Sequence, residues 1–177
     1  MIEHLPSQDK AIRLLEKSGC SPNVIQHSKT VARLAAKMAG ILQKRGFKVD
    51  RELVVTGALL HDIGRSKTHS VDHAIVGAKM AESAGMSVAI VRIIERHVGA
   101  GIPQDEAAKL GWPKKNYLPE TLEERIVAYA DKLVEGNARV PMSKTIAQFS
   151  RKLGKNHPSI ARLKALDEEF RSLLGES

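Results

Sequence analysis

Six side chains that can ligate a metal stand on or beside helix faces where periodicity predicts apolar residues. They are His27, His61, Asp62, His73, His97 and Asp131. One histidine on such a face is usually a hydrogen-bonded core residue, but a buried carboxylate needs a compensating charge. The six together favour a shared cation site. Imidazole and carboxylate ligands suit one or two divalent transition metal ions, namely Mn, Fe, Co, Ni or Zn.

The adjacent pair His61 and Asp62 is the sharpest local signal. Neighbours on a helix point about 100° apart, so both reach one metal only at a helix end or beside a second metal. The helix is expected to stop at once, with Gly64 letting the chain turn sharply away. The single cysteine, Cys20, excludes a thiolate site and an internal disulfide, and it fits a reducing cytoplasm.

Basic side chains close to these ligands could bind an anion. Arg65 follows the pair by one turn, and its planar fork suits a phosphate group. A guanidinium cannot donate a proton, so Lys67 and His69 are the candidates for protonating a leaving group. The alternative for either one is a solvated loop residue. Lys132, beside Asp131, is either a phosphate contact or a surface lysine.

Helical periodicity accounts for nearly every segment that must position these residues, so we expect an all-α fold, a compact helical bundle. The predicted helices cover residues 8–17, 22–45, 51–63, 73–85, 88–98, 104–110, 119–136, 143–153 and 158–174. A loop is expected at 64–70, and no strand is expected. Pro141 marks a boundary between a domain at 1–140, which includes the N-terminal helix, and a C-terminal helical appendage at 141–177 packed on it.

Composition narrows the classes of function. The chain has 177 residues, 42% hydrophobic and 27% charged, which is ordinary for a soluble globular protein. No apolar run is long enough to span a membrane and no apolar leader precedes the first helix, so we expect a cytoplasmic protein without a membrane partner. The net charge of +8 attracts phosphates, but Lys and Arg are scattered and aromatics are only 3%. A small anionic substrate is favoured over extended nucleic acid.

The order His27, His61-Asp62, Asp131 resembles the signature of the HD-domain superfamily of metal-dependent phosphohydrolases, and HDIGR at 61–65 resembles its HDIG form. The resemblance covers roughly residues 20–136. It implies an all-α bundle that hydrolyses a phosphomonoester or phosphodiester, usually in a nucleotide or dinucleotide. The spacing is similar to that of bacterial diadenosine tetraphosphate hydrolases, and the stretches around HVGAGIP and YADKLVEG look like a small archaeal HDIG group.

The resemblance also implies roles for the residues. His27, His61, Asp62 and Asp131 match the defining ligands, and His73 and His97 match two further histidines of dinuclear members. Asp62 would bridge two metals, and a metal-bound hydroxide would attack phosphorus. Asp62, Arg65 and Lys67 are then the expected catalytic residues, while Arg65, Lys67, His69 and Lys132 are the expected substrate contacts.

Two other classes of function stay open on the sequence. One is a non-catalytic nucleotide- or RNA-binding regulatory module that keeps the metal site for structure. The other is a di-iron oxygenase on the same helical scaffold.

Overall fold

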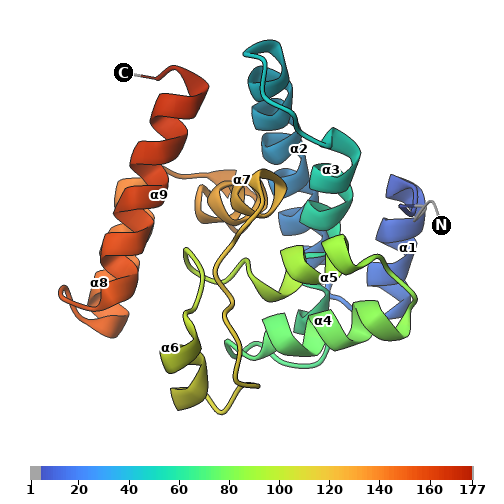
Figure 1. Ribbon diagram of the computed structural model, residues 1–177. Helices are drawn as coiled ribbons and strands as arrows, with labels where there is room; N and C mark the ends of the chain where they lie inside the picture. The colour runs from blue at the N-terminus through green and yellow to red at the C-terminus, as the bar shows by residue number, and fades with distance from the viewer. Residues whose placement is uncertain (1–4, 177) are drawn as a thin grey trace.

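The computed structural model describes residues 5–176, and their regular secondary structure is helical apart from one short two-stranded hairpin (Figure 1). The elements in chain order are α1 (Gln8–Lys17), α2 (Pro22–Lys44), α3 (Arg51–Leu60), the 3₁₀ helix η1 (Ile63–Ser66), α4 (His73–Ser83), α5 (Val88–Glu95), α6 (Gln104–Lys109), α7 (Leu122–Lys132), strands β1 (Val134–Glu135) and β2 (Ala138–Arg139), α8 (Met142–Leu153) and α9 (Pro158–Leu174). The all-α prediction is confirmed.

Local chemistry sets where most of the long helices begin. Ser7, Ser21, Asp50, Ser87 and Thr121 each accept a hydrogen bond from the backbone N–H three residues later. Such N-caps satisfy amides that lack a partner within the helix.

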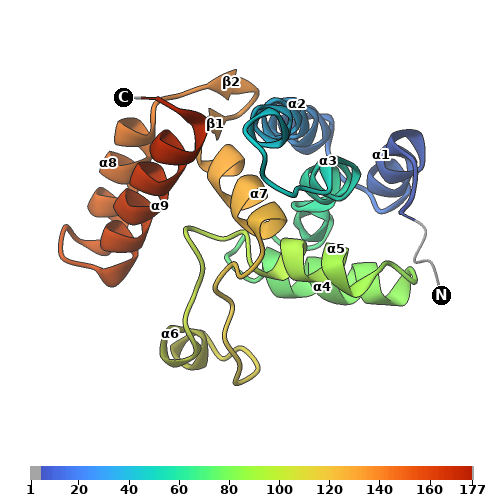
Figure 2. The same ribbon diagram turned by 45° about the horizontal axis from the view of Figure 1, so that its top comes forward.

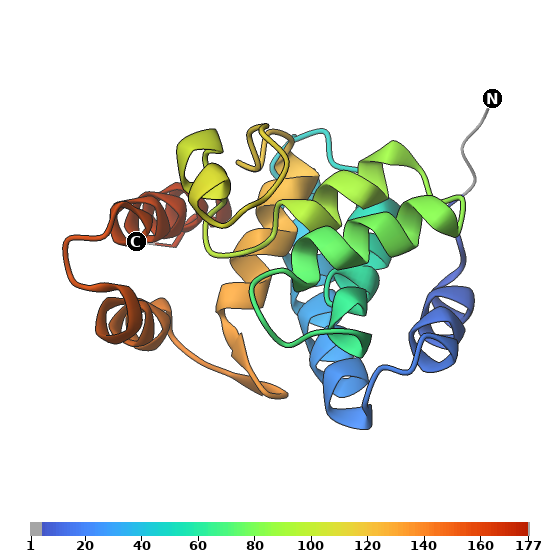
Figure 3. The same ribbon diagram turned by 90° about the horizontal axis from the view of Figure 1, so that it is seen from below.

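Helix α7 lies at the centre of the molecule, between the α8–α9 pair on one side and α2 to α5 on the other (Figures 1 and 3). Helices α2 and α3 pack together, and α4 pairs with α5. The core is built from aliphatic residues such as Val31, Leu42, Leu60 and Ile126, all fully buried. This arrangement brings the ends of five helices close to one another.

The C-terminal helices share this core. Leu163 and Phe170 of α9 are fully buried in it, and the Phe170 ring stacks on Tyr129 of α7 with centroids 4.5 Å apart. The Tyr129 hydroxyl donates to Asp167 at 2.9 Å. Figure 2 shows helices α8 and α9 running along one side of the molecule.

A second, smaller core lies under the segment that carries α6. Trp112 is 7% exposed there, its ring meets Tyr117 edge-on at 5.2 Å, and its indole N–H donates to Asp72 at 2.7 Å. Asp72 directly precedes α4, so this segment is attached to the start of that helix.

Several predicted boundaries were wrong. Helix α3 ends at Leu60 rather than at residue 63, and α7 begins at Leu122 rather than at residue 119. The expected loop at 64–70 starts inside η1, and α5 ends at Glu95 rather than at residue 98. The His97 ring lies 2.6 Å from the Ile94 carbonyl and takes the place of the next helical N–H. After α7 the chain forms a β1–β2 hairpin, with Val134 opposite Arg139, instead of continuing as a helix.

The hairpin escapes a periodicity analysis because each strand has two residues. Gly136 in its turn has a φ of 58°, which favours glycine. The Val140 N–H then donates to the Leu133 carbonyl at 2.9 Å, satisfying the end of α7. Within residues 5–176, no helix is both long and apolar enough to cross a bilayer.

Candidate metal centre

The six predicted ligands converge on one point, and most of them come from helix ends. His27 lies in the second turn of α2 and Asp131 in the last turn of α7. His61 and Asp62 follow α3 directly, His73 is the first residue of α4, and His97 comes two residues after α5. Helix ends allow neighbouring side chains to turn to one point, which a continuous helix does not.

The four imidazoles are oriented in the same way. Each Nδ1 lies close to a backbone carbonyl oxygen: Ala58 for His61, Ser70 for His73, Ile94 for His97 and Gly136 for His27, at 2.6, 2.7, 2.6 and 2.7 Å. Because a carbonyl only accepts, each ring carries its proton on Nδ1. In the neutral ring Nε2 therefore presents a lone pair to the centre, which is the usual orientation of a metal-ligating histidine.

One half of the centre contains His27, His61 and Asp131. The Asp131 Oδ1 atom lies 3.0 Å from His27 Nε2 and 3.4 Å from His61 Nε2. The Asp62 Oδ2 atom reaches the same half, at 3.8 and 3.6 Å from these two nitrogens.

The other half contains His73 and His97, whose Nε2 atoms are 3.0 Å apart. The second oxygen of Asp62, Oδ1, faces this half at 3.1 Å from His73 Nε2 and 3.4 Å from His97 Nε2. Asp62 thus lies between the two halves with one oxygen toward each, the position of a bridging carboxylate.

The pKa values of Asp62 and His97 are shifted because several ionisable side chains lie close together in a buried site. Burial alone raises the pKa of Asp62, but His61, His73 and His97 outweigh it and hold that pKa well below its usual range. Burial lowers the pKa of His97 to about 4, assisted by His61 and His73 and opposed by Asp62. His97 is therefore neutral at pH 7 and its Nε2 is an acceptor.

These residues fit a divalent cation. Two nitrogens that both present lone pairs 3.0 Å apart repel each other unless a positive charge lies between or beside them. The buried atoms His61 Nε2 and Asp62 Oδ1 have no hydrogen-bond partner among the described residues. Burial lowers the pKa of His61, but Asp62 and Asp131 outweigh it and raise that pKa, which also indicates a place for a cation.

Lys132 is buried, at 8% exposure, so its interpretation as a surface lysine was wrong. Its ammonium contacts Asp131 Oδ2 and donates to the His97 carbonyl at 3.2 Å. Burial raises the pKa of Asp131, but Lys132, His27 and His61 hold it well below its usual range. Lys132 thus contacts both halves of the centre, through Asp131 in one and the His97 backbone in the other.

The other predicted site residues separate into two groups. Arg65 is partly buried, with Nε donating to Asp62 Oδ2 at 2.8 Å and Nη1 to the His69 carbonyl at 3.4 Å. Arg65 and His69 line the cavity described below. Lys67 is exposed and lies outside that lining, so the structure does not bring it to the ligands.

Gly64 has a different role from the sharp turn that we expected. Its φ is not in the left-handed region, but a Cβ added there would lie 1.9 Å from the His73 carbonyl oxygen. Glycine is therefore required because η1 and the first turn of α4 touch at this point. That contact places His73.

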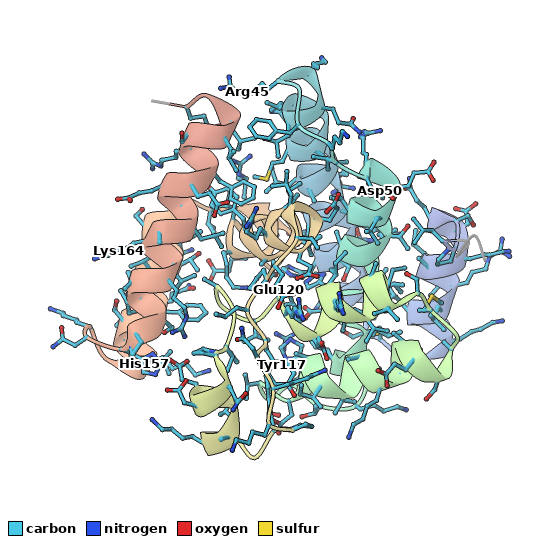
Figure 4. The ribbon with its side chains drawn as sticks, in the orientation of Figure 1. Arg45, Asp50, Tyr117, Glu120, His157 and Lys164 are labelled. Carbon is cyan, nitrogen blue, oxygen red and sulfur yellow. The ribbon has the colours of Figure 1, made fainter. Side chains whose placement is uncertain are left out.

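The centre opens into a cavity of about 1070 Å³. Arg65, Lys132 and the predicted ligands other than His61 form one side of it. Helices α6, α8 and α9 supply the opposite side, including Phe149, His157 and Arg162, which sequence reasoning missed. Figure 4 shows His157 at the end of the α8–α9 pair that lies nearest to α6. Helical spacing on α8 is the signal that could have found this wall.

The sequence matches the HD domain family model over residues 24–136, more than half of the chain. This chain is an HD-domain protein. It therefore belongs to the superfamily of metal-dependent phosphohydrolases that its motif resembles. The matched residues contain all six predicted ligands, while α8 and α9 follow them.

Relatives of this HD domain carry several names. An uncharacterized protein of Methanocaldococcus jannaschii is 48% identical over 94% of this chain and 98% of its own. A tRNA (cytidine(56)-2'-O)-methyltransferase of Picrophilus torridus is 41% identical over 99% of this chain, which spans only 49% of that enzyme. Ribonuclease Y of Acidothermus cellulolyticus is 39% identical over 48% of this chain and 17% of its own length.

A solved structure has the same fold. The HD domain of the Listeria monocytogenes phosphodiesterase PgpH, in complex with cyclic-di-AMP, superposes with a TM-score of 0.56 at 18% identity. The match covers 94% of this chain and 95% of that one, so α8 and α9 belong to a shared architecture.

Proposed function

We propose that this HD-domain protein is a metal-dependent phosphohydrolase that cleaves a phosphomonoester or phosphodiester of a nucleotide. One observation carries the proposal: ligands with inward-facing lone pairs form the floor of a cavity that also presents the cations of Arg65 and Lys132. A site that served structure alone would need no such opening.

His27, His61 and Asp131 would hold one divalent cation, His73 and His97 a second, and Asp62 both. Such cations supply Lewis acidity toward phosphoryl oxygens and lower the pKa of water near the reacting phosphorus. The remaining roles belong to side chains of the cavity.

Arg65 would bind a phosphoryl oxygen. Its Nε donates to Asp62 at 2.8 Å and its Nη1 to the His69 carbonyl at 3.4 Å, and these two bonds hold the planar fork where Arg65 lines the cavity. Lys132 holds Asp131 and the His97 carbonyl, so its role is to orient ligands. His69 lines the cavity and can carry a proton to a leaving group, whereas Lys67 lies outside it.

The test is a hydrolysis panel with phosphate detection and nucleotide separation. The purified protein is freed of metal and loaded with Mn²⁺, Co²⁺, Ni²⁺, Fe²⁺ or Zn²⁺. Mono-, cyclic and dinucleotides are offered, together with a short oligoribonucleotide. Turnover that requires metal and disappears in Asp62→Asn supports the proposal, and absence of hydrolysis across the panel overturns it.

The oligoribonucleotide is included because of a second candidate, an RNA phosphodiester as substrate. The likeness to half of a tRNA methyltransferase and to part of ribonuclease Y favours it, as does the net charge of +8. Faster hydrolysis of the oligoribonucleotide than of every mononucleotide and dinucleotide would identify RNA as the substrate.

A further inference from the structure

One face of α8 forms a wall of the cavity. Thr145, Gln148, Phe149 and Lys152 all line it, and their spacing of three, four and seven residues places them on one side of a helix. All four lie outside the residues that match the HD domain family. The six predicted ligands lie within the matched residues, while this wall belongs to the C-terminal helices.

Two contacts fix this wall beside the metal centre. The Thr145 hydroxyl donates to the Lys132 carbonyl at 2.6 Å, and Lys132 adjoins the ligand Asp131. Four residues further along α8, the Phe149 ring lies over Gly99: a Cβ added to that glycine would be 3.7 Å from Phe149 Cε1. Gly99 comes two residues after the ligand His97, so the ring lies next to the segment that holds the centre.

The cavity-facing side of α8 makes a third contact, with the β1–β2 hairpin. The Gln148 side-chain amide donates to Glu135 Oε1 of β1 at 3.0 Å. With Thr145 bound to the end of α7, the cavity-facing side chains stand on a helix anchored to two neighbouring elements. A rigid wall loses less conformational entropy when it binds a ligand.

The chemistry of the cavity is divided. Charged and imidazole groups gather at the metal centre and recur on the opposite wall, as with Lys152 and Arg162. Most of the lining surface is nevertheless apolar and includes Val98, Ile102 and the half-buried ring of Phe149. A cavity of about 1070 Å³ matches the upper end of small-ligand sites, about 300–1,000 Å³. A phosphate group at the ligands would leave the apolar part to another portion of the substrate.

We propose that this face of α8, with Phe149 at its centre, binds the nucleobase of the substrate while the phosphate lies at the metal centre. A nucleobase is flat, its faces are apolar, and it stacks on an aromatic ring. Phe149 is then a specificity-determining residue that takes no part in the chemical step. This inference rests on the proposed function for the identity of the phosphate-bearing group.

The test compares ligands that share a phosphate and differ in the base. Dissociation constants are measured with Mn²⁺-loaded protein for AMP, GMP, CMP, UMP, ribose 5-phosphate and inorganic phosphate. We expect at least one nucleotide to bind more tightly than ribose 5-phosphate. Phe149→Leu, which keeps apolar bulk, should weaken that nucleotide roughly ten- to hundredfold and leave ribose 5-phosphate and inorganic phosphate unchanged.

Two further variants make the result specific. Phe149→Trp keeps a stacking surface and should retain the preference for the nucleotide. Phe47→Leu is the matched control, because Phe47 is 39% exposed and lies outside the cavity lining, and it should change no constant. Melting temperature and metal content are measured for each variant, so that a folding defect is recognised.

The inference is overturned if ribose 5-phosphate binds as tightly as every nucleotide, or if Phe149→Leu weakens all ligands equally. Base-dependent binding without hydrolysis of any ester would support this subsite and count against the hydrolase proposal. Hydrolysis without a preference for any base would support the hydrolase proposal and count against this subsite.

Discussion

The two oxygens of Asp62 face opposite halves of the metal centre, Oδ1 toward His73 and His97 and Oδ2 toward His27 and His61. Asp62→Asn keeps the shape of the side chain and removes the negative charge that offsets the cations. We expect this variant to lose bound metal and all metal-dependent hydrolysis. Metal content after dialysis and initial rates measure the effect, and Asp9→Asn, at an exposed position in α1, is the control. Retained activity in Asp62→Asn would refute hydrolysis at this site.

Arg65 contributes a positive charge 2.8 Å from Asp62 and is not itself a ligand. Its removal should therefore keep or increase the affinity for metal. We expect Arg65→Ala to lower kcat/KM by roughly one to three decades, because a cation that binds the phosphoryl group is lost. Arg65→Lys should recover much of that loss. An unaffected kcat/KM in Arg65→Ala would remove Arg65 from the substrate site.

At this scale the sequence was informative about residue types and less so about contacts. His27, His61, His73, His97 and Asp131 could be selected because they recur together on apolar faces, and Asp62 because it directly follows His61 at a helix end. The burial of Lys132 could not be predicted, since it depends on how α7 packs against the segment after α5. The Arg65–Asp62 ion pair could have been predicted from the sequence, because residues three apart on a helical turn are neighbours.

Between elements, Gly64 is the point where η1 touches α4. We expect Gly64→Ala to lower the melting temperature and to weaken metal binding, because the added methyl group would overlap the His73 carbonyl and displace that ligand. Thermal denaturation with and without metal checks this. Gly40→Ala is the matched control, since Gly40 lies within α2 with nothing within 4 Å of an added Cβ. That control should be stabilised by about 0.5–1 kcal/mol.

Helices α6 and α9 are joined by one ion pair at the cavity. Both guanidinium Nη atoms of Arg162 donate to Glu106, at 3.0 and 2.6 Å, and both side chains are about one-fifth exposed. Glu106→Gln and Arg162→Met, alone and combined, should give a coupling free energy of about 1 kcal/mol in a double-mutant cycle. Denaturant unfolding measures it. Additive effects of the two changes would show that the pair does not hold α6 to α9.

Element boundaries were predictable where a capping residue marks them and unpredictable where a tertiary contact decides them. Ser21 and Asp50 predict the starts of α2 and α3, and in the structure they are the N-caps of those helices. The end of α5 depends on His97 bonding the Ile94 carbonyl. That bond forms because the ring must turn toward the other ligands, and periodicity carries no such information.

In the whole molecule, the ligands come from widely separated parts of the chain, from residue 27 to residue 131. Unfolding separates them, so a cation that binds only the folded state stabilises it. At a free metal concentration of 100 times Kd the gain is about 2.7 kcal/mol, or about 5–10 °C in melting temperature for a chain of this size. Calorimetry with and without chelator measures the shift. An unchanged melting temperature would contradict metal binding at this centre.

The indole of Trp112 can serve as a built-in fluorescent reporter of metal binding in solution. It is the chain's single tryptophan, it is packed on Tyr117, and its N–H bonds Asp72, the residue before His73. Fluorescence excited at the red edge of the absorption band therefore comes from this one residue, next to a predicted ligand. We expect its emission to change when metal engages His73, without any attached label, so that stopped-flow mixing can time the filling of the centre.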